Sequence, residues 1–299
     1  MKLINSKVEI LEQLPGIDGM TKQIEIAGRT CYKSENKITE ASSREFVQRM
    51  RNSGHTAMLE HGTVYLTYST KADKVDEEFS AYKYISNPYS HVNVHNDEGN
   101  CTFYITTNYR VIVENGWEED LKYWSEPTEH HDKRIAVRFT CSRIQSQSLC
   151  RHRVMSFAQE SQRYCNYAKD KFANEVTFIM PSDIDLPEGH YEFNFYKEGW
   201  YTDGERTQHD VEKYEDVDLY LWSLNQAEDA YVSLIKRGWK PQKARGVLPN
   251  DTKTEIVVTG FETDWQHFFS LRCVPSAHPD MQKLANELYF KLYNKKYVK

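Results

Sequence analysis

The stretch of the sequence with the most potential for chemistry is CRHRVMSFAQESQRYCNY, residues 150–167. It places Arg151, Arg153 and Arg163 beside a histidine, two serines and two glutamines. A planar guanidinium group forms paired, charge-assisted hydrogen bonds with phosphate or carboxylate oxygens. Hydroxyl and amide groups add neutral donors for the same oxygens. This combination predicts a local anion-binding site, although RHR alone is more often a basic helix end exposed to solvent.

If the anion is a phosphate, side chains must hold it. The sequence has neither a GxGxxG pattern after a strand nor a GxxxxGK[ST] pattern, so both usual glycine-rich phosphate cradles are missing. Between residues 151 and 172 there are five Arg and Lys residues against two acidic ones. The local charge is therefore positive.

The chain as a whole is acidic, with a net charge of −6. General binding of nucleic acid or anionic membranes depends on bulk positive charge. No run approaches the roughly 18 apolar residues of a membrane helix, and the first residues, MKLINSKVEI, lack the apolar core of a secretion signal. We therefore expect a cytoplasmic protein with no nucleic-acid partner and no membrane partner.

Hydrophobic periodicity predicts a mixed order of strands and helices. The expected strands are 7–11, 63–70, 101–107, 134–140, 175–181 and 254–261. The expected helices are 21–31, 39–52, 108–124, 141–150, 207–237, 241–246, 263–273 and 279–295. Residues 71–100 are polar and 185–208 loop-like, and no repeat or linker divides the chain. This pattern predicts one α+β domain over residues 1–299, with a mainly antiparallel sheet flanked by helices and surface insertions near 70–100 and 185–208.

Arg272 stands on the apolar face of its expected helix. Trp265, Phe268, Phe269 and Arg272 follow the spacing i, i+3, i+4 and i+7, which puts all four on one helix face. An arginine on a buried face must be paired, because an unpaired buried charge is costly. The pattern alone leaves two partners open, a structural carboxylate or an anionic substrate.

Seven residues separate RHR from the next S-Q-R, and this interval reproduces the signature of the flavin-dependent thymidylate synthases. Other segments resemble the same family: GHTAMLEHG at 54–62, KARGVLP at 243–249, and FFSLR at 268–272 followed by SAHPDMQ. The resemblance extends from about Arg29 to about Asn286. The sequence is thus identified as similar to that family over most of its length.

The resemblance implies an activity, cofactors and an assembly. It implies methylation of dUMP to dTMP with methylenetetrahydrofolate as carbon donor and FAD relaying hydride from NADPH. No enzyme nucleophile is implied, and Arg272 would act catalytically by favouring ionisation of the uracil N3. The family further implies a homotetramer whose active sites draw on several subunits.

The resemblance also implies two sets of binding residues. Those expected to bind dUMP are Ser148, Arg151, Gln159, Ser161, Gln162, Arg163, Arg245 and Arg272. Those expected to bind FAD are His55, Ala57, Arg151, His152, Arg153, Phe261, Thr263 and His267. No resident metal is expected, because His55 and His61 have no third ligand nearby; His61 is interpreted as a hydrogen-bonded turn residue.

Two alternative interpretations remain. Cys150 lies beside the arginines and would be an activated nucleophile if they lowered its pKa, although a packed core thiol is the favoured interpretation. The stretch from Arg151 to Arg163, with Tyr164 and Tyr167, would also suit a module that stacks and neutralises single-stranded nucleic acid. The acidic net charge argues against such a module.

Overall fold

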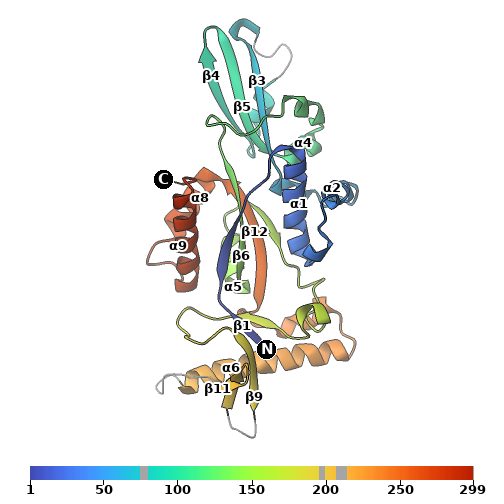
Figure 1. Cartoon of the computed structure of the whole chain (residues 1–299), viewed down its shortest axis with the longest axis vertical. Coiled ribbons are helices and arrows are strands. Elements are labelled where there is room, and N and C mark those ends of the chain that lie inside the picture. Colours follow the sequence, from blue (N-terminus) through green and yellow to red (C-terminus); the bar gives the residue numbers. More distant parts are fainter. Residues whose placement is uncertain (75–79, 195–198, 207–213, 299) are drawn as a thin grey trace.

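The computed structural model describes residues 1–74, 80–194, 199–206 and 214–298, and its strands form three sheets. Figure 1 shows these sheets following one another along the long axis of the molecule, with the four-stranded sheet in the middle. The mixed α+β class and the mainly antiparallel pairing predicted from the sequence are confirmed, but the strands divide among three sheets instead of one. That the chain forms a single domain stays a prediction.

The four-stranded sheet has the order β2-β6-β12-β7, and its neighbours are all antiparallel. Its strands are β2 (Lys7–Leu11), β6 (Arg134–Ser142), β7 (Ser156–Gln159) and β12 (Lys253–Phe261). Within β12, Ile256 and Val258 belong to one buried cluster, whereas Val257 between them belongs to another. Successive strand residues point to opposite faces, so both faces of this sheet are covered.

Helices cover the two faces of this sheet from opposite sides (Figure 1). They are α1 (Gly16–Tyr32), α5 (Arg143–Leu149), α8 (Glu262–Arg272) and α9 (Pro279–Asn294). The short η1 (Glu35–Lys37) follows α1, and α2 (Ser42–Asn52) packs on α1. α8 and α9 share a core with Val258, to which Trp265 and Leu284 contribute. On the opposite face, Ala27 of α1 meets Val257. We call these two sides the α8 face and the α1 face.

The three-stranded sheet has the order β3-β5-β4 and lies at one end of the molecule (Figure 1). This part contains η2 (Thr56–His61), β3 (Thr63–Lys71), η3 (Ala72–Lys74), α3 (Tyr82–Ile85), β4 (His91–Asp97), β5 (Asn100–Asn108), α4 (Tyr109–Asn115) and η4 (Glu118–Tyr123). Its core joins Leu66 and Phe103 to Phe46 of α2. The three-stranded sheet is thereby anchored to the α1 face.

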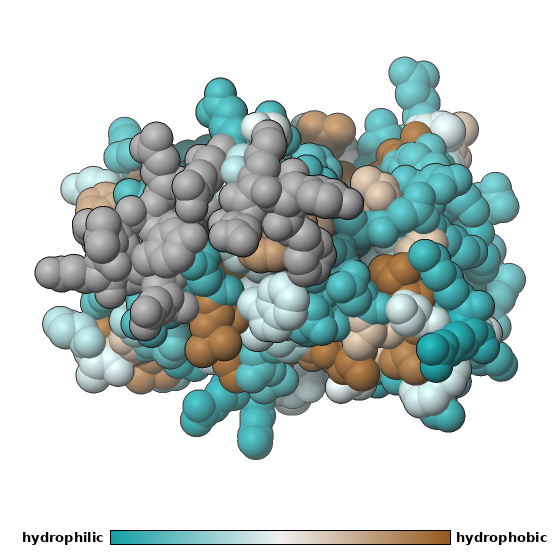
Figure 2. All heavy atoms as spheres, turned by 90° about the horizontal axis from the view of Figure 1, so that it is seen from below, coloured by the Kyte–Doolittle hydropathy of each residue, from teal (hydrophilic) through white to brown (hydrophobic). Residues whose placement is uncertain are grey.

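The five-stranded sheet has the order β11-β10-β9-β1-β8 and lies at the other end with α6 (Figure 1). Its elements are β1 (Lys2–Ile4), η5 (Asp170–Phe172), β8 (Thr177–Ile179), β9 (Gly189–Asn194), β10 (Gly199–Thr202), β11 (Glu205–Arg206), α6 (Tyr214–Lys236), α7 (Pro241–Ala244) and η6 (Arg245–Val247). Leu221 and Tyr231 of α6 pack against Phe178 and Trp200. Figure 2 looks onto this end, and where the grey atoms leave it visible, apolar residues are scattered among polar ones.

Several predicted elements are wrong in detail. The supposed loop at 185–208 contains β9, β10 and β11, and the polar stretch 71–100 contains β4. The helix expected at 141–150 begins only at Arg143, because β6 continues through Ser142, whose side chain then caps α5. The helix expected at 108–124 is interrupted by Gly116 in the left-handed conformation. The expected start of the 207–237 helix lies outside the described residues, which contain α6 from Tyr214.

In the described part of the chain, every helix is too short or too polar to cross a membrane.

Candidate active site

The RHR segment and α8 together line a cavity of about 510 Å³. Its wall consists of Arg151, His152, Arg153, Val154, Met155, Asp264, His267, Leu271 and Arg272. We call this cavity the cationic pocket, because its wall contains three arginines and one carboxylate. Its size falls within the range of about 300–1,000 Å³ that is typical of small-molecule sites. The structure thus brings five of the predicted site residues together around one cavity: Arg151, His152, Arg153, His267 and Arg272.

A short, capped helix positions the RHR segment. Ser142 accepts a hydrogen bond from the Gln145 N–H, and the Gln145 side chain returns one to the Ser142 N–H, which closes a capping box. α5 ends at Leu149, and the His152 N–H donates back to the Leu149 carbonyl at 3.0 Å. β7 begins at Ser156, shortly after this turn. Both ends of the RHR segment are therefore fixed by regular structure.

Arg272 is held in place by neutral acceptors. Its Nε donates to His152 Nε2 at 3.2 Å, and a terminal nitrogen donates to the Ser148 carbonyl at 3.0 Å. No carboxylate of the described residues pairs with it, so the structural carboxylate left open by the sequence is not its partner. Asp264, the acid in the wall, accepts the Phe261 N–H at 2.8 Å instead. The positive charge of Arg272 is therefore left for another anion.

The electrostatics of the pocket agree with this conclusion. Burial, followed by the charges of Arg272, His267 and Arg151, lowers the pKa of His152 to about 4. His152 is thus neutral near pH 7, which fits its role as acceptor for Arg272. Burial and then Arg151 also lower the pKa of Arg272. A bound anion would relieve the repulsion among these cations.

Two further predicted dUMP residues lie on the same side of the sheet. Ser148 belongs to α5 and supplies the carbonyl that Arg272 contacts. The Gln159 amide donates to Ser146 Oγ of α5 at 2.7 Å and to Thr254 Oγ1 at 3.3 Å. Gln159 is therefore oriented by the helix that also supports the RHR segment.

The S-Q-R segment lies on the opposite side. The Ser161 N–H donates to the Cys31 carbonyl at the end of α1, at 2.9 Å. The ring of Tyr164 contacts Tyr32, whose hydroxyl lies 3.1 Å from His55 Nδ1. Arg163 is exposed next to Tyr164. Ser161, Arg163 and His55 thus gather on the α1 face, so one chain does not bring them together with the cationic pocket.

Apart from Gln162, which belongs to the S-Q-R segment, the remaining predicted residues lie outside both groups. Ala57 is exposed in η2, and Thr263 is exposed in the first turn of α8. Phe261 is buried, with its ring stacked on His91 at 3.6 Å. Arg245 belongs to η6, beside α6, and no contact that the structure describes links it to the cationic pocket. Gln162 is buried beside Arg163.

Sequence reasoning missed a buried ionic network next to the residues predicted to bind dUMP. Lys253 Nζ lies 2.9 Å from Glu160 and 2.7 Å from Glu255, which also pairs with Lys33 at 2.9 Å. Tyr167 donates its hydroxyl to the other oxygen of Glu160 at 3.1 Å. Glu160 separates Gln159 from Ser161, so the network anchors both. The only signal in the sequence was an acid between two predicted ligands.

We expect Lys253→Met to lower the free energy of unfolding by about 3–5 kcal/mol, because it leaves the fully buried Glu160 carboxylate without its cation. Arg44→Met, which breaks the exposed pair with Asp18, should cost at most about 1 kcal/mol. Urea denaturation of both variants measures the difference. Equal free energies of unfolding for the two variants would show that the Lys253–Glu160 pair does not stabilise the fold.

The network also predicts a pH dependence. Burial alone would raise the pKa of Glu255, but Lys253 and Lys33 outweigh it and lower the pKa to about 2 from its usual 4.5. The stabilising contribution is therefore complete above pH 4.5 and is lost as the pH falls towards 2. In urea titrations over this window, Lys253→Met should lose less stability than the wild type. An equally steep loss in both proteins would contradict the assignment.

Three other sequence interpretations have clear outcomes. His61 is buried and its Nδ1 lies 2.8 Å from Thr259 Oγ1, which confirms the hydrogen-bonded interpretation. Cys150 was expected to be a packed core thiol, but it is exposed where α5 ends. Its pKa is nevertheless raised, because partial burial outweighs Arg143, so it is not an activated thiolate. Tyr167 is buried and is therefore not available to stack on a nucleic-acid base.

Comparisons with known proteins place the chain in a family. The family model of the thymidylate synthase complementing protein matches residues 120–295, more than half of the chain. A flavin-dependent thymidylate synthase of Geobacter sulfurreducens is 30% identical over 147 residues, 49% of this chain and 50% of the relative. One of Pyrococcus furiosus is 31% identical over 186 residues, 60% of this chain and 64% of the relative. The chain thus spans between half and two thirds of the length of these relatives.

A solved structure shows a weaker likeness. Thymidylate synthase X from Helicobacter pylori, with FAD and dUMP, aligns at 16% identity and a TM-score of 0.40, covering 98% of this chain and 95% of the other. FAD and dUMP are ligands of that protein. The family match, by contrast, includes the RHR segment, the S-Q-R segment and α8. The chain belongs to the family of flavin-dependent thymidylate synthases, which the thymidylate synthase complementing protein represents.

Proposed function

We propose that the protein methylates dUMP to dTMP, with methylenetetrahydrofolate as carbon donor and FAD relaying hydride from NADPH. The observation that carries this proposal is the cationic pocket, in which Arg272 has only neutral partners although it is half-buried. Family membership supplies the reaction. The pocket supplies the groups that such a reaction needs, namely fixed cations beside a place for an anionic ring.

The side chains of the cationic pocket fit a flavin nucleotide. Arg151 and Arg153 are exposed at its mouth, where their guanidinium groups suit a pyrophosphate. Val154 and Leu271 are 62% and 47% exposed and offer apolar contacts to a flat ring system. FAD bound here would supply hydride to the transferred carbon. His267 lines the same wall, whereas binding roles for Phe261, Thr263, His55 and Ala57 rest on the family resemblance.

The chain's own residues would bind and polarise the nucleotide. Ser161, Gln162 and Arg163 combine hydroxyl, amide and guanidinium groups, as phosphate binding requires. Gln159, Ser148 and Arg151 would contact the rest of dUMP, with Arg245 completing the nucleotide site. Arg272 would stabilise negative charge as the uracil loses its N3 proton, because a fixed cation in a dry site needs no reorganisation. No residue of the chain needs to form a covalent bond.

Association of two copies of the chain would bring the S-Q-R segment of one copy to the cationic pocket of the other. The S-Q-R segment lies on the α1 face and the cationic pocket on the α8 face of one chain. A site that uses both requires a second copy whose α1 face meets the α8 face of the first. We propose active sites shared between copies on this ground; that the assembly is a homotetramer rests on the family resemblance alone.

Coexpression of Arg163→Ala and Arg272→Ala chains tests the shared site. In hybrids, an intact Arg163 from one chain meets an intact Arg272 from another. At dUMP concentrations below the wild-type KM, hybrids carrying two affinity tags should form dTMP well above the mean of the two parent variants. Hybrids no more active than that mean would place each site within a single chain.

The proposed reaction is tested directly by measuring dTMP formed from dUMP, methylenetetrahydrofolate and NADPH. We expect product only when FAD is present, and none when NADPH is replaced by NADP⁺. A flavin-loaded protein that binds dUMP but forms no dTMP would contradict the proposed reaction. An FAD-independent reaction would contradict the flavin's role.

Cys150 is expected to be dispensable. Cys150→Ala should retain dTMP formation within about tenfold, a change of less than about 1.4 kcal/mol in the barrier, because the raised pKa keeps the thiol protonated. Steady-state rates at saturating dUMP and normal flavin content measure this. A loss of about four orders of magnitude with flavin intact would restore the nucleophile model.

A further inference from the structure

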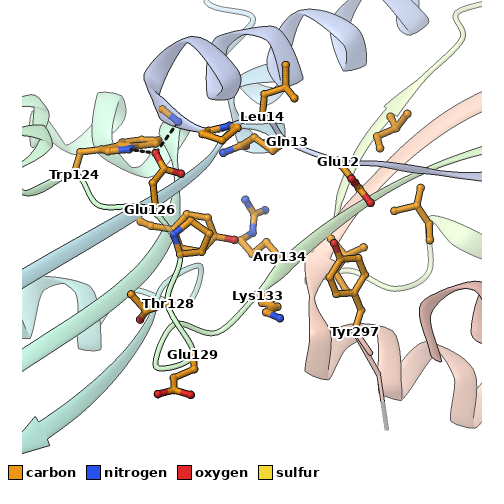
Figure 3. Close-up of a pocket in the computed structure, with 17 residues that line it drawn as sticks. Glu12, Gln13, Leu14, Trp124, Glu126, Thr128, Glu129, Lys133, Arg134 and Tyr297 are labelled. Carbon is orange, nitrogen blue, oxygen red and sulfur yellow. Dashed lines mark hydrogen bonds between the residues drawn. The ribbon is translucent and has the colours of Figure 1, made fainter. Parts of the chain in front are cut away.

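A second cavity of about 510 Å³ lies where the N-terminal segment, the chain after η4 and the start of β6 meet the C-terminal end (Figure 3). We call it the N-terminal cavity. It shares no lining residue with the cationic pocket. None of the residues expected to bind dUMP or FAD lines it. The proposed reaction therefore gives this cavity no role.

The wall of the N-terminal cavity is rich in flat apolar side chains. Tyr65, Trp124 and Tyr297 line it, and Pro15 and Pro127 add rigid apolar surface. In Figure 3, the labelled Trp124 and Tyr297 stand on opposite sides of the space. A cavity of this size and composition is suited to a ring system of a small molecule.

The acidic side chains of the wall already have partners. Glu126 accepts the Gly16 N–H at the start of α1, at 2.9 Å, and Glu12 pairs with Lys295. Glu129 is largely exposed near His130. Glu126 and Glu12 are therefore bound to other groups of the protein, and none of the three carboxylates forms an ion pair with Lys133 or Arg134 in the described structure.

Arg134 is the basic residue in the middle of the lining side chains, between Gln13 and Lys133 (Figure 3). One terminal nitrogen donates to the Glu60 carbonyl at 3.0 Å and the other to Ser156 Oγ at 3.5 Å. Its Nε is buried without a partner, and no carboxylate of the described residues pairs with it. Each terminal nitrogen carries two N–H groups, so one on each remains for a ligand.

Lys133 extends the positive wall. The nearest group described for its Nζ is the ring of Tyr297, at 5.5 Å from the ring centroid, and it has no carboxylate partner among the described residues. A guanidinium and an ammonium group thus line one aromatic cavity with no protein anion bound to either. Lys133 is exposed, whereas burial desolvates the guanidinium of Arg134, which is costly unless something offsets it.

We propose that the N-terminal cavity binds a small aromatic carboxylate. Its carboxylate bonds to the free N–H groups of Arg134, with Lys133 nearby, and its ring lies among Tyr65, Trp124 and Tyr297. The pairing of a guanidinium fork with a carboxylate is the strong, directional contact expected of this geometry. The site does not depend on the proposed methylation reaction.

The probes for this site are 2-naphthoate and its uncharged analogue 2-naphthamide, added to the purified 299-residue chain. Ligand-observed NMR titration gives the dissociation constants. We expect 2-naphthoate to bind at least about tenfold more tightly than 2-naphthamide, and Arg134→Met to remove that difference. Arg272→Met, which changes the cationic pocket, should leave naphthoate binding unchanged.

A second variant covers the possibility that Arg134→Met does not fold. Leu14 is exposed and lines the cavity, so Leu14→Trp should fill the space without burying a new charge and should weaken naphthoate binding about tenfold. Equal binding of acid and amide, no binding of either, or unchanged naphthoate binding in the Leu14→Trp protein overturns the proposal. So does loss of binding in Arg272→Met, since the ligand would then occupy the cationic pocket.

Discussion

Replacing Arg272 with alanine is expected to lower the maximal rate of dUMP methylation by about 10²–10³-fold, and saturating dUMP is not expected to restore it. The guanidinium is fixed by hydrogen bonds to His152 and to the Ser148 carbonyl, and no carboxylate of the described residues forms an ion pair with it. Its attraction for the uracil should therefore grow as negative charge develops on the ring. An interaction that is stronger in the transition state than in the ground state affects turnover more than binding.

Arg163→Ala is the matched control for Arg272→Ala. Arg163 is exposed and follows Ser161 on the α1 face, where it should hold the phosphate equally in both states. Its loss should raise the apparent dUMP constant by about 10²-fold, about 2–3 kcal/mol. Much of the turnover should return at saturating dUMP. Steady-state kinetics with dUMP separates the two effects.

Deoxyuridine, which lacks the phosphate, provides an independent check. Arg163→Ala should hardly worsen its already poor use, whereas Arg272→Ala should still slow it. If saturating dUMP rescues Arg272→Ala but not Arg163→Ala, the two arginines have the opposite roles and the nucleotide is wrongly oriented.

The double variant Arg151→Ala/His152→Ala is expected to be folded but colourless. Both residues line the cationic pocket, and the sequence has no glycine-rich cradle to hold a flavin by its backbone. Losing Arg151 removes a charge-assisted contact, and losing His152 also removes the acceptor that orients Arg272. We expect flavin content to fall from stoichiometric to undetectable by visible absorbance.

Circular dichroism and a melting curve establish that the double variant is folded. Arg44→Ala, which changes an exposed arginine that belongs to neither predicted set of binding residues, should keep its full flavin content. Stoichiometric flavin in the double variant would place the cofactor elsewhere.

The part of the site that depends on local spacing was predictable from the sequence. The i, i+3, i+4, i+7 pattern placed Arg272 beside Trp265 and Phe268, both of which are buried in α8. The RHR segment was expected to form a compact basic site, and α5 and β7 hold it as one. Short-range patterns succeed here because a helix fixes which side chains share a face.

The division of the predicted residues between two faces was not predictable. It depends on the pairing of β7 with β12 and on the contact of Ser161 with Cys31, 130 positions away in the sequence. The network around Glu160 has the same origin, because Lys253 reaches it only through this strand pairing. Local patterns do not encode contacts of this kind.

Missed strands have a different cause. β4 is a polar edge strand with most of its residues exposed, and in HVNVHND only Val92 and Val94 alternate, a pattern too short to mark a half-buried strand. β9 does alternate, since Tyr191 is buried and Phe193 packs against the core, but the surrounding glycines suggested a loop. Tertiary packing outweighed the local signal in both cases.

The visible absorbance spectrum of the purified protein, recorded before and after addition of dUMP, tests whether this chain holds a flavin beside its nucleotide. If the cationic pocket holds a flavin next to the nucleotide, the protein loaded with FAD shows flavin bands, and dUMP perturbs them in a saturable way. In the Arg163→Ala protein the same perturbation should require about 10²-fold more dUMP. A protein that stays colourless after incubation with FAD, or a flavin spectrum that dUMP leaves unchanged at every concentration, would contradict the account.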